Sequence, residues 1–187
     1  MKPPRLFMLL LGCKPKQRNT EQHDVFFGIG NELKDLLPAI LHFWPEANGK
    51  IHIDAWREVT AIDQYRILIL PKEQSGQEAT ATKLFFLNLG GYKPGEFEEF
   101  HYRLVVAGED KGAAVEHAKQ TAFYRHTGFK GATSHIDEKY GIDVDDFYEI
   151  EDILSSAEKE KYSIIVLPGK ENEPDELHLG YTRLEKL

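Results

Sequence analysis

The chain has 187 residues, of which 41% are apolar and 29% charged, and its net charge is −8 with its 8 histidines counted as neutral. These values are typical of a globular protein of one domain or two small ones, and the acidic balance argues against nucleic acid as a partner, because proteins that bind nucleic acid usually carry a basic excess. No apolar run approaches the length of a membrane-spanning helix and the single cysteine excludes an intrachain disulfide, so we expect a soluble cytoplasmic protein without a membrane partner.

An apolar stretch near the N-terminus occurs twice. Arg5–Gly12 and Lys83–Gly90 share one pattern at an offset of 78 residues. Both are apolar at nearly every position, which predicts central strands covered on both faces. The first stretch also resembles a lipoprotein signal, but its mid-chain copy cannot act as one. Further positions kept at the same offset are Glu21 with Glu99 and His23 with His101. We therefore predict an internal duplication.

The first copy is predicted to contain strands at 6–11, 23–29, 50–56 and 65–70, with a helix at 33–44. The large apolar residues of this helix recur at spacings of three and four, which is typical of a single buried stripe. Pro38 lies inside it and should kink it, because proline removes a backbone hydrogen bond. Strand 50–56 alternates, which places Ile53 on one face and His52, Asp54 and Trp56 on the other.

The second copy follows the same order, with strands at 84–89, 101–107 and 162–167 and a helix from Asp110 to about residue 127. In it, His135-Ile136-Asp137 repeats His52-Ile53-Asp54. Residues from about 138 to 160 form an acidic insertion, interpreted as a solvated helical face, with a short strand at 144–150 as the alternative. A last strand at 177–183 has no counterpart in the first copy.

These boundaries predict a first repeat unit at 1–74, a linker at 75–82, and a second repeat unit at 83–187 that carries the acidic insertion and the extra C-terminal strand. The fold class is α+β, an internal duplication of a strand–strand–helix–strand–strand unit with helices packed on mixed β-sheet. Whether the strands form one continuous sheet or two is left open.

Two stretches, Arg18–Gly28 and Lys50–Val59, resemble an uncharacterised bacterial family that is catalogued as domain of unknown function 1543. The likeness extends over nearly the whole chain. That family carries no assigned activity, cofactor or catalytic residue. The resemblance therefore implies a small soluble bacterial protein and no particular reaction.

Histidines and carboxylates that recur in both copies are the candidate site residues, because strand propensity does not favour them. Glu21 and His23, like His52 and Asp54, are two residues apart, which is about 6.6 Å along a strand and brings their tips to one side. Imidazole with carboxylate suits a polar ligand, a transition metal, a general base or a plain hydrogen bond between strands. The predicted ligand-binding residues are Arg18, Glu21, Gln22, His23, His52, Asp54, Glu99, His101, His135 and Asp137.

Other patterns are less specific. The chain lacks motifs such as His-Glu-x-x-His or paired Cys-x-x-Cys, so we assign no metal and no cofactor. Lys14, Lys16 and Arg18 form a basic loop whose counterpart in the second copy is acidic. An anion site in the first copy alone and two solvated loops both stay open. Cys13 with His23 as its base is a further alternative.

No motif forces a reaction. The leading hypothesis is a non-enzymatic binding module for a small polar molecule or a protein partner. One alternative is a hydrolase-like enzyme that uses histidine and aspartate or glutamate at the interface between the repeats. The other is a structural or self-associating protein, so a homo-oligomer is kept open.

Overall fold

The computed structural model describes residues 2–75, 81–92, 95–119, 143–169 and 173–187. The chain divides into two compact units, which we call unit 1 (Met1–Ala79 with Leu154–Leu187) and unit 2 (Thr80–Ile153). Both are α+β, as predicted. Every strand pair in the described ranges is antiparallel. The prediction of mixed sheets is therefore wrong. Hairpin connections such as the short loop after Cys13 suit antiparallel neighbours.

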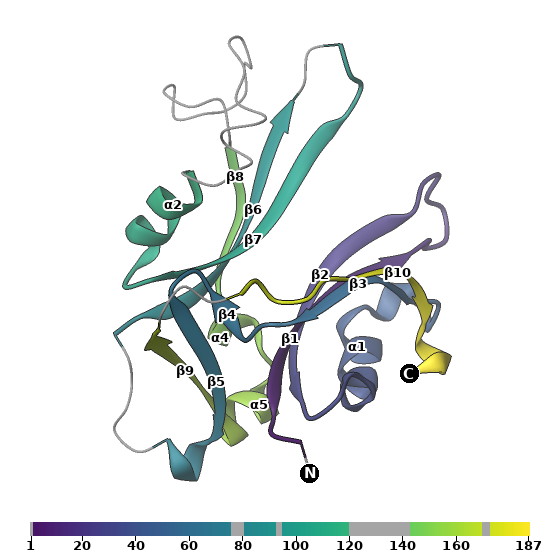
Figure 1. Cartoon of the computed structure of the whole chain (residues 1–187). Coiled ribbons are helices and arrows are strands. Elements are labelled where there is room, and N and C mark those ends of the chain that lie inside the picture. The colour runs from purple at the N-terminus through teal and green to yellow at the C-terminus, as the bar shows by residue number, and fades with distance from the viewer. Residues whose placement is uncertain (1, 76–80, 93–94, 120–142, 170–172) are drawn as a thin grey trace. The chain divides into compact units, whose positions relative to one another are not determined.

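Unit 1 contains two antiparallel sheets, ordered β10-β3-β1-β2 and β4-β5-β9 (Figure 1). Its elements are β1 (Arg5–Cys13), β2 (Gln22–Gly30), η1 (Leu33–Leu36), α1 (Leu37–Phe43), η2 (Pro45–Ala47), β3 (His52–Glu58), β4 (Ala61–Ile62), β5 (Tyr65–Pro71), η3 (Lys72–Gln74), α5 (Ser156–Lys161), β9 (Tyr162–Pro168), β10 (His178–Arg183) and η4 (Leu184–Lys186). Strand β1 lies between β2 and β3, so the prediction of a central strand is confirmed.

The predicted helix at 33–44 is divided into the 3-10 turn η1 and the short helix α1. Pro38 occupies the first turn of α1, where its missing N–H has no helical partner to lose, so the expected kink is replaced by a new helix start. Leu36 and Ile40 are fully buried against the alternate β1 residues Phe7, Leu9 and Leu11. Each such side chain stabilises the fold by about 1.5–3 kcal/mol.

Strand β3 contains a β-bulge. Leu11 pairs with Ile53 but Leu10 pairs with Ala55, so Asp54 is an extra residue in the strand. Strict alternation placed Trp56 on the face of His52, and that prediction is wrong. The bulge returns Trp56 to the helix-covered face, where it pairs with Leu9 and packs against the core. A bulge shifts the alternation because two residues then oppose one.

Unit 2 contains one antiparallel sheet, ordered β7-β6-β8. Its described elements are β6 (Lys83–Tyr92), β7 (Glu99–Gly108), α2 (Lys111–Lys119), β8 (Asp143–Glu149) and α4 (Ile150–Ile153). Asp110 caps α2, accepting a hydrogen bond of 2.9 Å from the Ala113 N–H, as its place before the helix predicted. Within the expected acidic insertion, 143–149 is the strand of the alternative interpretation and 150–153 and 156–161 are helical, while residues 138–142 lie outside the described residues.

The C-terminal segment belongs to unit 1. Strand β9 pairs with β5, from Tyr65 opposite Pro168 to Pro71 opposite Tyr162, and β10 pairs with β3. The extra strand was expected in the second repeat unit, but its hydrogen-bonding partner lies in the first. Sequence order alone does not reveal such a pairing, because β9 and β5 are distant in the chain.

Asp175 ties this segment to the end of β3. Its carboxylate accepts hydrogen bonds from the Thr60 N–H at 3.1 Å and the Thr60 hydroxyl at 2.6 Å. It also lies 3.9 Å from the Arg57 guanidinium, and its side chain is only 3% exposed. Burial lowers the pKa of Arg57, and the charge of Asp175 opposes that effect.

We expect Asp175→Ala to lower the free energy of unfolding by about 3 kcal/mol, because it leaves the largely buried Arg57 guanidinium unpaired. Urea denaturation followed by circular dichroism measures the change. The control is Glu176→Ala, the neighbouring carboxylate with an 83% exposed side chain, which should change the value by less than about 0.5 kcal/mol. Equal effects of the two substitutions would contradict the assignment.

No helix within the described ranges is long and apolar enough to cross a membrane.

Candidate functional site

The predicted histidines of unit 1 lie in one row across the sheet. Gly12 on β1 is the register partner of both His23 on β2 and His52 on β3. The flanking residues Leu11 and Cys13 belong to the core beneath α1. Because side chains alternate along a strand, Gly12 and its partners lie on the other face of the sheet.

Two imidazoles and two carboxylates meet on this face. His52 Nε2 lies 3.1 Å from Glu21 Oε1 and 3.3 Å from Asp54 Oδ1. His23 Nε2 lies 3.3 Å from Asp54 Oδ2 and 4.0 Å from Glu21 Oε2. The Tyr181 ring, 4.4 Å from the His52 ring, helps to bury His52. We call Glu21, His23, His52 and Asp54 the unit 1 cluster.

Charge in the unit 1 cluster needs compensation. A neutral imidazole nitrogen donates or accepts a single hydrogen bond, yet His23 Nε2 and His52 Nε2 each face two carboxylates. Asp54 Oδ2 is buried and receives no hydrogen bond from the described residues. A buried carboxylate oxygen without a hydrogen-bond donor is costly, so a further donor or a cation would stabilise this arrangement.

Gly12 keeps the space for this cluster open. A Cβ at that position would lie 2.6 Å from Asp54 Oδ2 and would overlap the His52 ring. Any other residue would displace these side chains. The glycine is therefore required by a close approach of side chains to the backbone, not by a turn.

Unit 2 contains a related group on its own sheet. Gly90 pairs with His101, as Gly12 pairs with His23. His101 Nε2 lies 3.3 Å from Asp145 Oδ2 and 3.9 Å from Glu99 Oε2, and the three donor atoms lie within 4.8 Å of one another. A Cβ on Gly90 would lie 2.5 Å from Asp145 Oδ2. We call Glu99, His101 and Asp145 the unit 2 cluster.

Asp145 was missed as a site residue. The sequence echo pointed to His135 and Asp137, which lie outside the described residues. In the sheet of unit 2, Asp145 is the extra residue of a bulge between the pairs Asn88 with Asp146 and Leu89 with Val144. It thus has the place that Asp54 has in β3. A usable signal existed, because each aspartate is followed two positions later by an aromatic residue and four positions later by glutamate.

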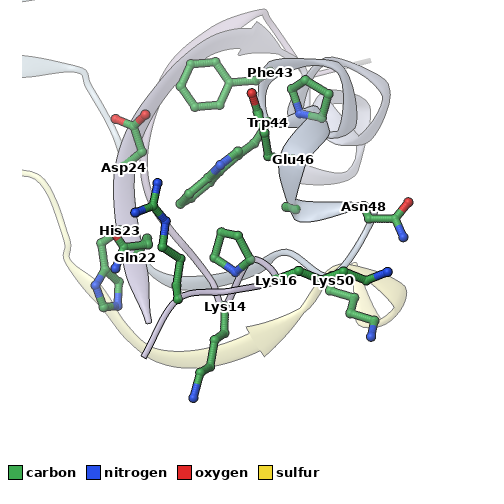
Figure 2. A pocket seen from close by; sticks show the side chains of 14 residues that line it. Lys14, Lys16, Gln22, His23, Asp24, Phe43, Trp44, Glu46, Asn48 and Lys50 are labelled. Carbon is green, nitrogen blue, oxygen red and sulfur yellow. The ribbon is translucent and has the colours of Figure 1, made fainter. Parts of the chain in front are cut away.

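A groove of about 890 Å³ opens beside the unit 1 cluster. Figure 2 shows Trp44 between His23 and Asp24 on one side and Asn48 and Lys50 on the other. Its charged lining residues are Lys14, Lys16, Arg18, Lys50, Asp24 and Glu46, and Phe43, Trp44, Gln22 and His23 also contribute. The predicted residues of unit 1 therefore gather in two adjoining places, the cluster and the groove, which share His23.

Cys13 is poorly suited to act as a nucleophile. The side chain is 1% exposed and packs in the core of unit 1. Burial raises the pKa of its thiol, and the negative charges of Glu21 and Glu46 raise it further. A raised pKa leaves less of the reactive thiolate at neutral pH.

We expect iodoacetamide to label Cys13 in the folded protein at pH 7 much more slowly than in the same protein unfolded in urea. The physical reason is that burial hides the sulfur and the raised pKa keeps it protonated. Mass spectrometry over time measures the two rates, and the rate for the folded chain should rise with pH. Comparable rates at pH 7 would restore the nucleophile interpretation.

Comparison with known families and structures supports the resemblance noted from the sequence. The family described as Domain of Unknown Function (DUF1543) matches residues 18–69, a segment that contains Glu21, His23, His52 and Asp54. No curated protein matches the chain.

A similar solved structure is the crystal structure of a protein Il1583 from Idiomarina loihiensis. It has 20% sequence identity and a TM-score of 0.61, and the match covers 97% of each chain. At this identity the similarity concerns the fold alone.

Proposed function

We propose that this chain, whose residues 18–69 match the DUF1543 family, binds a small anionic ligand with a flat apolar part in the groove of unit 1. The observation that carries the proposal is the composition of the groove lining. Four cationic side chains, Lys14, Lys16, Arg18 and Lys50, stand against the two carboxylates of Asp24 and Glu46.

The charge of the groove contrasts with that of the chain. The protein as a whole has a net charge of −8, so an excess of cations on one concave surface is a local feature that favours anions. All four cationic side chains are exposed and therefore free to close over a phosphate or carboxylate. Their guanidinium and ammonium groups are the usual partners of such ligands.

The aromatic residues of the groove add a second element of recognition. Trp44 is half-buried against the core and Phe43 is 41% exposed, so both rings are fixed at one end and accessible at the other. Rings of this kind bind flat apolar groups by stacking. A volume of about 890 Å³ lies in the range of pockets for small molecules, which is about 300–1,000 Å³.

A hydrolase-like enzyme is the second candidate, and the position of His23 favours it. This imidazole lines the groove and lies 3.3 Å from Asp54 Oδ2. A histidine that is oriented by a carboxylate and faces a ligand site has the arrangement of a general base. In this alternative, His23 would accept a proton from a water or hydroxyl in the groove.

We also propose that the two units arose by the internal duplication that the repeated stretches predict. The support is their common register: Arg5 pairs with Gly30 as Lys83 pairs with Gly108. The bulges of β3 and β8 fall opposite positions that are 78 residues apart, Leu10/Leu11 and Asn88/Leu89. Irregularities that recur at one offset are hard to explain by independent origin.

We propose the bacterial cytoplasm as the place of action. The sequence resembles a bacterial family, and the single cysteine is a free, buried thiol, which is usual for a protein of a reducing compartment.

The binding proposal is tested with Trp56→Phe, which leaves Trp44 as the only tryptophan. We expect adenosine monophosphate to change Trp44 fluorescence in a saturable way, with weaker binding of inorganic phosphate and of adenosine, because each probe lacks one recognised group. Lys14→Glu combined with Lys16→Glu should weaken binding of the nucleotide at least about tenfold, since two attractive charges become repulsive.

The matched control is Lys2→Glu, an exposed lysine that does not line the groove, which should leave the affinity unchanged. Saturation that is equal in all variants, or no response to the nucleotide and phosphate, would contradict anion binding in this groove. Release of phosphate from the nucleotide, abolished by His23→Gln, would favour the hydrolase-like alternative.

A further inference from the structure

We propose that each unit contains a binding site for a divalent transition-metal ion, formed by Glu21, His23, His52 and Asp54 in unit 1 and by Glu99, His101 and Asp145 in unit 2. The inference concerns the sheet face beside Gly12 and Gly90 and does not depend on anion binding in the groove. The ligand class is a cation such as Zn²⁺, for which imidazole nitrogen and carboxylate oxygen are suitable donors.

In unit 2 the donor atoms of Glu99, His101 and Asp145 lie within 4.8 Å of one another, which is close enough for one ion to gather them. Two donors that each lie about 2.0–2.1 Å from a tetrahedral zinc ion are about 3.3 Å apart. In the unit 1 cluster the two imidazoles approach different carboxylate oxygens: His52 Nε2 lies 3.1 Å from Glu21 Oε1 and 3.3 Å from Asp54 Oδ1, and His23 Nε2 lies 3.3 Å from Asp54 Oδ2. Binding of one ion here therefore requires these side chains to move closer together. The 4.0 Å between His23 and Glu21 is the longest contact, and Glu21 is half-exposed and able to adjust.

The electrostatics of the cluster point the same way. Asp54 Oδ2 is buried and accepts no hydrogen bond from the described residues, although it faces His23 Nε2. Two carboxylates that face the same two imidazoles repel each other unless a positive charge lies among them. A divalent cation would supply that charge. It would be bound through the lone pairs of the imidazole nitrogens.

The unit 2 cluster has the same geometry. The distance from His101 to Asp145 is 3.3 Å and that from His101 to Glu99 is 3.9 Å, against 3.3 Å and 4.0 Å for the corresponding contacts of His23. Within unit 2, both the bulge that projects Asp145 and the glycine over which its carboxylate lies recur. An accidental contact of exposed side chains would not be expected to keep donor types, distances and backbone irregularity together.

Glycine at the centre of each cluster makes room for the aspartate carboxylate. Any Cβ at Gly12 would meet Asp54 Oδ2 at 2.6 Å, and one at Gly90 would meet Asp145 Oδ2 at 2.5 Å. Both carboxylates thus lie directly over backbone, with their oxygens held toward the imidazoles.

The test is isothermal titration of the chelator-treated full-length protein with ZnCl₂. We expect two equivalents per chain. Asp54→Asn and Asp145→Asn should each remove one equivalent, or weaken it at least about tenfold, because the amide keeps the side-chain size but loses the charge. The double variant should bind neither.

Two further measurements keep the result interpretable. Glu21→Gln changes a half-exposed side chain and should also weaken the unit 1 site, which serves if Asp54→Asn folds poorly by circular dichroism. The matched control is His178→Ala, a half-buried histidine that stacks on Trp56 and lies 3.9 Å from the single carboxylate of Glu176, and this variant should retain both equivalents. Binding of Co²⁺, followed by its visible absorption, gives a readout of imidazole and carboxylate ligation.

Fewer than two equivalents in the unsubstituted protein would overturn the proposal. Two equivalents that persist in Asp54→Asn and Asp145→Asn would do the same, because the ions would then lie elsewhere. In either case the clusters would be hydrogen-bonded pairs of histidine and carboxylate, and the anion site in the groove would be unaffected.

Discussion

Both clusters depend on one steric constraint, the absence of a side chain at the end of the central strand. Gly12 and Gly90 leave a gap over which the carboxylates of Asp54 and Asp145 lie. Each aspartate reaches that place because it is the extra residue of a β-bulge in the neighbouring strand. A bulge changes the direction of side chains locally. The one inserted residue directs its carboxylate toward the histidine, and the aromatic residue two positions later then faces the core.

The two units share this arrangement and differ in what surrounds it. Unit 1 adds His52 to the cluster, Tyr181 packed on its ring, and a groove with an excess of cationic side chains. At the offset of 78 residues, the sequence of unit 2 has Pro94 where unit 1 has Lys16 and Glu96 where unit 1 has Arg18. This contrast supports the proposal of an anionic ligand in the groove of unit 1. The shared part is suited to hold a cation, and the unshared part to select a second ligand.

Much of the architecture was predictable because apolar patterning over five or six residues determines a strand wherever it lies in the chain. The central strands and the capped start of α2 at Asp110 follow from local chemistry. The helix around Pro38 and the face of Trp56 were predicted wrongly. In both cases a single residue, Pro38 or the bulge residue Asp54, interrupts the regular spacing of apolar side chains. A prediction from spacing over a whole segment does not detect such an interruption.

The candidate site divides in the same way. The sequence by itself determined the residue types, Glu and His two apart before each second strand and His-Ile-Asp in β3, because these repeat against strand propensity. Only the tertiary structure decided that Asp145 stands beside His101, and that the C-terminal strands pair with β3 and β5. Register, bulges and pairing between distant segments depend on which surfaces bury each other. Which surfaces do so is determined by the whole folded chain and not by any local stretch.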